Sequence, residues 1–275
     1  MKFQLKNTIV VLALTALFVS CSNDDDSSSV VEGTTGDVEL YFDNGVAGDA
    51  LILGNTYTNS NNESLTINRL NYIVSNFVLI KEDGTEFTYP KEESYFVISE
   101  EGDLLTVHLE GVPAGDYTKV KFGIGVDQQR YLQGESEQQS FWDLAVQHNL
   151  TWTWSTGYRF INFEGTYTSS AVEGEKTFQV HQGSNSATDN YREVTLILPT
   201  TARVREDEMP NIHLKTDANV ILDGTNKIKL ADNINEAQTG SAIMGGENLI
   251  SIAENTLQMF TVDHVHNGSH TGHRE

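Results

Sequence analysis

The segment KVKFGI at residues 119–124 alternates between apolar side chains and polar or small ones, so that Val120, Phe122 and Ile124 share one face. Such an alternation indicates a half-buried β-strand. The same pattern recurs along the chain at Val38, Leu40, Phe42, Val194, Leu196, Leu198, Ile212, Leu214, Ile228 and Leu230. Asp83-Gly84 and Asp223-Gly224 are typical of hairpin turns, and residues 113–117 (PAGDY) predict a tight turn into residues 119–124. We therefore predict an all-β fold, an antiparallel, immunoglobulin-like β-sandwich.

One segment near the end of the chain has helical rather than strand spacing. Its apolar residues recur at intervals of three and four, behind Gly245-Gly246; they are Leu249, Ile252, Ala253, Leu257 and Phe260. This periodicity predicts one short C-terminal helix near residues 247–259 that packs on the sandwich.

The first 20 residues have the composition of a signal peptide. Lys2 and Lys6 precede an uninterrupted run of apolar residues and Thr at 9–19, which is too short to span a bilayer. The chain has one cysteine, Cys21, and it follows Phe18-Val19-Ser20 where the apolar run ends. This order resembles a lipobox, although Leu is commoner than Phe at the first position. We predict that Cys21 is the lipid anchor; the alternative is an ordinary secretory peptide with an incidental cysteine.

The chain after Cys21 divides into a tether, one domain and a tail. Residues 22–29 (SNDDDSSS) are too polar to bury apolar area, so residues 21–35 are predicted to be a disordered acidic and serine-rich tether. The acidic run also resembles an export signal for the outer face of the outer membrane, with a plain spacer as the alternative. We predict one domain over residues 36–266, with 267–275 as a disordered tail. The expected location is the outer membrane, facing the periplasm or the cell surface.

The net charge argues against a nucleic-acid partner. The chain has 17 Lys and Arg and 39 Asp and Glu. Removal of residues 1–20 takes away two lysines and no acidic residue, which leaves 15 basic against 39 acidic groups and a formal charge of −24. Binding to phosphates requires a basic face.

Two clusters have residue types that could carry chemistry. The run TWTWSTGYRFINFEG at 151–165 contains two of the three tryptophans. If it is a strand, Trp152 and Trp154 stand side by side on one face, either as core or rim aromatics or as part of a site. His264-Val265-His266 would likewise place two imidazoles on one face, with Val265 toward the core. Two neutral imidazoles suit Zn, Cu or Ni, although His270 and His273 near the terminus are typical of simply exposed residues.

The remaining candidates give weaker signals. His181 follows Phe178 and Val180 in a strand pattern and faces away from their apolar face, as a structural histidine commonly does. We expect His108, His148 and His213 to be surface or hydrogen-bonding residues and Asp127 to be a turn cap. None of the catalytic motifs for nucleophilic, zinc or phosphate chemistry is present in the sequence. We therefore expect a protein that is not an enzyme, although a hydrolase with two carboxylates far apart in sequence stays open.

Several of these stretches, in consistent order, resemble the MbnP family of copper-binding proteins. They are LTINRLNYIVSNF at 65–77, residues 111–117, FGIGVD at 122–127, the Trp-rich run from Trp152, FQVHQG at 178–183, and Met259-Phe260 with His264 and His266. The resemblance covers nearly all of the chain after Cys21, and the Trp-rich run is its most specific part. One departure is Leu150, where we expect Met in related sequences.

The resemblance implies a β-sandwich that binds one copper ion. It implies that Trp152 or Trp154 is oxidised to kynurenine by a partner, a di-haem cytochrome c peroxidase of the MauG or MbnH type. It further implies that His264 and His266 are copper ligands, with His181 as a further ligand or a supporting group. Met259 could replace the missing thioether at Leu150 only if the end of the predicted helix faces the site.

A different class of binding protein is also open. Trp152, Trp154 and Tyr158 could form an exposed stacking platform through which a surface lipoprotein recognises a glycan or a protein, without a metal. The two interpretations differ in what they require of the fold. A copper site needs His264, His266 and a Trp to converge, whereas a platform needs flat, exposed aromatic rings.

Overall fold

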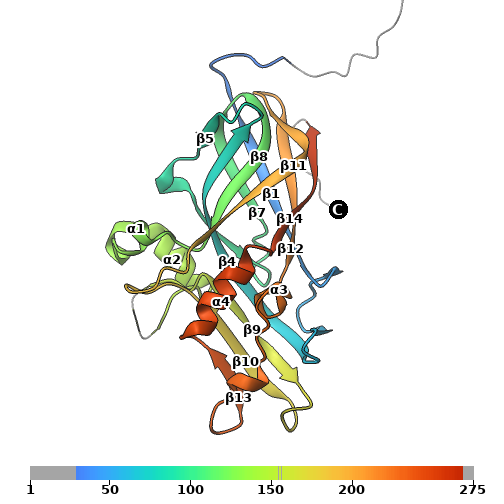
Figure 1. The fold of residues 1–275 in the computed structure, drawn as a ribbon. Helices are drawn as coiled ribbons and strands as arrows, with labels where there is room; N and C mark the ends of the chain where they lie inside the picture. Colours follow the sequence, from blue (N-terminus) through green and yellow to red (C-terminus); the bar gives the residue numbers. More distant parts are fainter. Residues whose placement is uncertain (1–28, 154, 156, 269–275) are drawn as a thin grey trace, which may run out of the picture.

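The computed structural model describes residues 29–153, 155 and 157–268, and within them the chain forms two β-sheets packed face to face (Figure 1). The first sheet has the order β14-β12-β1-β2, with β7 beside β1. Its strands are β1 (Thr35–Val46), β2 (Asp49–Ala50), β7 (Thr106–Pro113), β12 (Met209–Asp217) and β14 (Phe260–Gly268). We call it the five-stranded sheet.

The second sheet, called the nine-stranded sheet, has the order β11-β8-β4-β9-β10-β13, and the short strands β3, β5 and β6 also pair with β4. Its strands are β3 (Thr56–Thr58), β4 (Ser64–Lys81), β5 (Glu86–Thr88), β6 (Tyr95–Ser99), β8 (Gly115–Ile124), β9 (Ile161–Thr168), β10 (Lys176–Gln182), β11 (Arg192–Val204) and β13 (Gly240–Ile243). The helices are α1 (Gln128–Tyr131), α2 (Gln139–Gln147), α3 (Val220–Asp223) and α4 (Glu247–Thr256).

The predicted all-β fold is confirmed, and the alternating residues form the core between the sheets. Phe42 of β1 and Phe122 of β8 come from different sheets and meet edge to face, with ring centres 5.8 Å apart. The Phe260 ring lies 5.2 Å from the Phe122 ring, and Phe77 stacks on Phe122 at 5.4 Å. The sandwich is not wholly antiparallel, however, because β1 pairs with β12 and β10 pairs with β13 in parallel.

A second, smaller core covers the outer face of the nine-stranded sheet. Ile73 of β4 and Tyr95 of β6 point away from the first core and pack with Ala145 of α2, Leu150 and Tyr158. The prediction of a C-terminal helix is confirmed by α4, but the expectation of a single helix is wrong. The sequence pattern does not indicate α2, because the apolar face of this helix is short. The helix also covers a face of the sheet that the alternation of apolar and polar residues predicts to be exposed to solvent.

Two local predictions near residue 225 hold only in part. Ile228 and Leu230 are buried in the core but belong to no strand. Asp223-Gly224 ends α3, and the turn that follows is closed by an isolated antiparallel bridge between Asp223 and Lys227 and not by two paired strands. The Glu63 carboxylate accepts hydrogen bonds from the backbone N–H groups of Leu230 and Ala231, at 3.0 and 2.9 Å. A side chain thus replaces the neighbouring strand as the partner of this backbone.

Two other predicted turns are present in the structure, and the last strand is longer than expected. Gly84, with a φ of 86°, turns the chain between β4 and β5, and residues 113–117 turn it between β7 and β8, as predicted. The last strand continues to Gly268, beyond the expected limit at residue 266. No helix among the described residues is long and apolar enough to span a membrane. Cys21, Trp154, His270 and His273 lie outside the described residues.

Candidate metal centre

The first part of the Trp-rich run, up to residue 160, forms a loop and not a strand at those of its residues that the structure describes. Thr151 and Tyr158 form an isolated antiparallel bridge, and the Trp152 N–H donates to the carbonyl of Gly157 at 3.1 Å. The chain enters β9 only at Ile161. Residues 148–153, 155 and 157–160, here called the Trp loop, therefore fold back on themselves. The position of Trp152 is therefore set by this loop and not by the pairing of strands.

The Trp loop is held against the outer face of the nine-stranded sheet. Leu150 and Tyr158 are buried in the second core. Gly183, which follows β10, is essential to this approach, because a Cβ atom there would lie 2.4 Å from the carbonyl oxygen of Tyr158. The glycine of the FQVHQG motif thus lets the Trp loop contact the end of β10.

Trp152 covers His181, a residue of β10. The centres of the two rings are 6.0 Å apart in an edge-to-face arrangement. The guanidinium carbon of Arg159 lies 5.1 Å from the centre of the Trp152 ring. His181 points away from the first core, as predicted, yet it is only 2% exposed because the Trp loop covers it.

The charges around His181 hold its ring in one orientation. Its Nε2 lies 2.6 Å from Oε1 of Glu164 on the neighbouring strand β9, and Arg69 binds the other carboxylate oxygen at 2.6 Å. Burial alone would raise the pKa of Glu164, but the hydrogen bond from His181 and the charges of Arg69 and Arg159 outweigh it and lower the pKa. Burial lowers the pKa of His181, and with the charge of Arg159 it outweighs the hydrogen bond to Glu164, which would raise that pKa. Glu164 is therefore ionised and His181 neutral near pH 7, and Nε2 donates to Glu164.

This arrangement leaves a buried lone pair on the other nitrogen of the ring. His181 Nδ1 is inaccessible and makes no hydrogen bond to any residue that the structure describes. A neutral histidine with one nitrogen bonded to a carboxylate and the other unpaired has the arrangement of a metal ligand, in which the carboxylate fixes the tautomer. The sequence does not reveal that Glu164 bonds His181 or that Arg69 bonds Glu164, because strand register decides both contacts.

His264 and His266 lie together on one face of β14, and Val265 is in the core, as their spacing predicts. Their neighbour is His213 of β12, which is directly opposite His264; the two rings are 4.2 Å apart and nearly parallel, at 21°. The sequence predicts His213 only as a surface or hydrogen-bonding residue and gives no sign of its contact with His264. Lone pairs lie in the plane of an imidazole ring, so two stacked rings do not direct them at one ion.

The structure does not bring these histidines to Trp152. Val265 and Val180 both lie in the core between the sheets, so His264 and His266 face outward from one sheet and His181 from the other. Figure 1 likewise shows β14 on the opposite side of the molecule from α2, which precedes the Trp loop. Two packed sheets are about 10 Å apart, so one ion cannot be shared. Among the described residues, no group of three or more His, Cys, Asp or Glu side chains could hold a metal ion.

The other residues that the sequence analysis singled out have structural roles or are exposed. Asp127 caps α1 by accepting from the Arg130 N–H at 3.2 Å, as predicted. Met259 is buried in the core between the sheets, whereas Leu150 belongs to the second core, so Met259 does not replace a thioether there. His108 is exposed on β7, and its Nδ1 lies 3.4 Å from Glu39.

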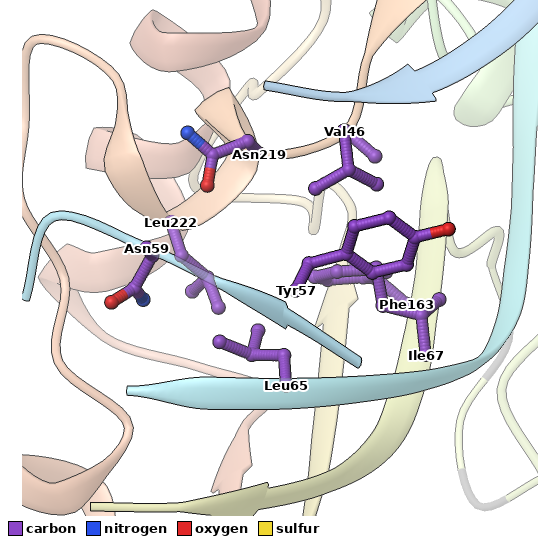
Figure 2. Close-up of a pocket in the computed structure, with 9 residues that line it drawn as sticks. Val46, Tyr57, Asn59, Leu65, Ile67, Phe163, Asn219 and Leu222 are labelled. Atoms are coloured by element: carbon purple, nitrogen blue, oxygen red, sulfur yellow. The ribbon is translucent and has the colours of Figure 1, made fainter. Parts of the chain in front are cut away.

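An enclosed cavity elsewhere is a feature of core packing. Figure 2 shows residues that line it, among them Tyr57, Leu65, Ile67, Phe163, Val46 and Leu222. Its volume of about 10 Å³ leaves room for at most about one water molecule. It is far too small for a glycan or another organic ligand.

The geometry defines an all-β protein with a buried histidine under a tryptophan loop. The model of the MbnP family matches residues 35–244, and the chain belongs to that family. The matched range includes Trp152, Trp154 and His181 and ends before His264 and His266. Among solved structures, MbnP from Methylosinus trichosporium is similar over 78% of this chain and 82% of that one, with 15% identity and a TM-score of 0.47. No curated protein matches the chain.

Proposed function

We propose that this protein binds one copper ion at His181 beneath Trp152 and handles copper without catalysing a reaction. The observation that carries the proposal is the buried, unpaired Nδ1 of His181, in a ring whose orientation is fixed by the Nε2–Glu164 hydrogen bond. Membership of the MbnP family, which is associated with copper handling, supports copper as the ion.

The residues present fit copper in one respect and need a modification in another. A neutral imidazole is a suitable ligand for copper. An indole has one N–H donor and no lone pair, whereas kynurenine has a carbonyl and an aromatic amine. Oxidation of Trp152 would therefore add donor atoms beside His181. We propose that a partner di-haem peroxidase performs this oxidation, so that copper binding depends on it.

The aromatic platform is less well supported by the geometry. Tyr158 is 1% exposed and bonds Oε1 of Gln138 at 2.8 Å, so it offers no ring face to a glycan. Trp152 is only partly exposed, between His181 and Arg159. A stacking site requires flat, accessible rings. Of the three proposed members, Tyr158 is buried, Trp152 is partly covered and Trp154 lies outside the described residues.

The dependence on tryptophan is tested with Trp152→Phe and Trp154→Phe, each produced with and without the peroxidase. We expect that production with the peroxidase gives the unmutated protein its copper binding but not Trp152→Phe, because phenylalanine cannot become kynurenine. Trp142→Phe is the matched control, since Trp142 belongs to α2 and not to the Trp-rich run, and its ring packs on Tyr158. Metal analysis gives the copper stoichiometry, and intact mass identifies the oxidised residue. If both Trp-loop variants bind copper as the unmutated protein does, there is no tryptophan-dependent site.

We also propose that the protein is anchored to the outer membrane by a lipid on Cys21. The apolar run at 9–19 and the order Phe18-Val19-Ser20-Cys21 support it. We expect Cys21→Ser to release the protein from the membrane fraction, and mass spectrometry of the unmutated protein to find acylated Cys21. An acylated Cys21→Ser protein that still fractionates with the outer membrane would disprove this anchor.

A further inference from the structure

Residues 127–138, here called the α1 segment, are held mainly by polar contacts. The segment includes α1 and the 3-10 helix η2 (Glu135–Gln138). Of its residues only Arg130 and Gln138 are buried, whereas its leucine, Leu132, is exposed to solvent. A segment with few buried apolar contacts opens at a lower cost in free energy than the core of the protein. The polar contacts of the α1 segment therefore decide how firmly it is closed.

The α1 segment contacts the Trp loop at two adjacent residues, Gly157 and Tyr158. A Cβ atom on Gly157 would be 2.5 Å from the hydroxyl oxygen of Tyr131, so the ring of Tyr131 lies directly against this glycine. Oε1 of Gln138 accepts from the Tyr158 hydroxyl at 2.8 Å, and its Nε2 donates to the carbonyl of Arg130 at 2.7 Å. The α1 segment thus covers the returning half of the Trp loop.

Two ion pairs join the α1 segment to the 3-10 helix η1 (Lys91–Glu93), which precedes β6. Nζ of Lys91 lies 2.8 Å from Oδ2 of Asp127, and Nη2 of Arg130 lies 2.7 Å from Oε2 of Glu92. Two neighbouring residues of opposite charge in η1 thus bind two residues of opposite charge, three positions apart, in the α1 segment. We call these two ion pairs the ionic latch.

The partners in the α1 segment are buried more deeply than those in η1. The side chain of Arg130 is 9% exposed, whereas that of Glu92 is 72% exposed. Asp127 is likewise less exposed than Lys91. The Arg130 guanidinium lies over the ring of Tyr95 at 5.4 Å, and the Tyr95 hydroxyl donates to Asp127 at 2.6 Å. A buried charge that loses its partner is strongly unfavourable, so loss of either η1 partner favours an open position in which water reaches that charge.

We propose that the ionic latch closes a gate over the Trp loop, and that its opening lets the α1 segment and the Trp loop move away from His181 so that solutes reach this residue. The inference rests on the proposed function for the identity of the copper ion that enters, whereas the gate itself is a property of the chain without a ligand. The closed state remains the main one after the latch is broken, because Leu150 and Tyr158 still pack in the second core. Breaking the latch should therefore speed entry and leave the affinity for a ligand of the closed state nearly unchanged.

The gate is tested without copper, by the reaction of His181 with diethyl pyrocarbonate in the mature chain. This reagent modifies neutral imidazoles that it can reach, and His181 is only 2% exposed in the closed state. We expect Glu92→Gln and Lys91→Met each to speed its modification about two- to fivefold, as the loss of one ion pair with an exposed member predicts. The double variant should speed it about tenfold. Mass spectrometry of peptides assigns the modification to each histidine.

Two matched variants and one other histidine serve as controls. Glu93→Gln removes the same charge as Glu92→Gln from an exposed position of the same helix, and Lys91→Arg keeps the charge of the lysine. Both should react as the unmutated protein does. His264 is exposed on β14 and should react at one rate in all variants. Unchanged modification of His181 in the latch variants, or an equal rise in Glu93→Gln, would overturn the gate and leave the proposed copper site untouched.

Copper kinetics distinguish a gate from a support that only holds the site together. In protein produced with the peroxidase, copper should associate with the latch variants faster by the same factor as His181 is modified, while the affinity changes less than about threefold. Stopped-flow mixing and competition titrations with a chelator measure the two quantities. A loss of affinity without faster association would show that the latch is only a support. Faster modification of His181 together with copper binding that is unaffected by His181→Ala would overturn the copper site and retain the gate.

Discussion

Phe122→Ala is expected to lower the free energy of unfolding by about 3–5 kcal/mol. The Phe122 side chain is fully buried and contacts the rings of Phe42, Phe77 and Phe260. Its loss removes these contacts and leaves a cavity among large aromatic rings that cannot collapse to fill it. Domains are stable by only about 5–15 kcal/mol, so this one change removes a large share. Chemical denaturation of the mature chain, followed by circular dichroism, measures the difference.

The matched control for Phe122→Ala is Ile197→Ala, on the adjacent strand β11. Ile197 is 73% exposed, and its truncation should change the free energy of unfolding by no more than about 0.5 kcal/mol. A loss below about 1 kcal/mol in Phe122→Ala would contradict the position of this ring at the centre of the aromatic core. A large loss in both variants would contradict the outward orientation of Ile197.

The sequence predicts the sandwich well because its signal is local. Residues two apart share a face, so Val38, Leu40 and Phe42 identify their strand without knowledge of its neighbours. The signal fails where a second layer covers the outer face. Asn71 alternates with buried Leu70 and Tyr72 and is expected in solvent, yet α2 and the Trp loop bury that face.

For the same reason, the sequence predicts only part of the candidate site. The spacing of His264 and His266 correctly predicts a shared face, but it cannot show that their neighbour is His213 and not Trp152. His181 is recognisable as a strand histidine on the outward side. Its contact with Glu164 depends on the register of β9 and β10, and the Trp loop that covers it is closed by the Thr151–Tyr158 bridge. Long-range pairing of this kind leaves no local periodicity in the sequence.

The two histidine locations give opposite expectations for copper, which makes the comparison decisive. His181 has a buried lone pair, a fixed tautomer and a tryptophan against its ring. His264 stacks on His213 and is bonded through Nδ1 to Asp263 at 2.9 Å, on an exposed surface. A preorganised ligand needs little ordering when the ion binds, whereas the stacked rings must first separate.

His181→Ala is therefore expected to lower copper affinity at least about 100-fold, or about 2.7 kcal/mol, since even groups that only support a metal ligand contribute about 10–100-fold. His264→Ala and His266→Ala are expected to change it less than about threefold, and they serve as controls for the loss of any one imidazole. All three variants are titrated with copper against a competing chelator after circular dichroism shows that each is folded. His181→Gln guards against a folding defect, because it can keep a donor toward Glu164 while removing the imidazole, and it should lose copper as alanine does. If His264→Ala and His266→Ala lose affinity while His181→Ala keeps it, copper binds on the outer face of the five-stranded sheet, and the buried lone pair of His181 has another purpose.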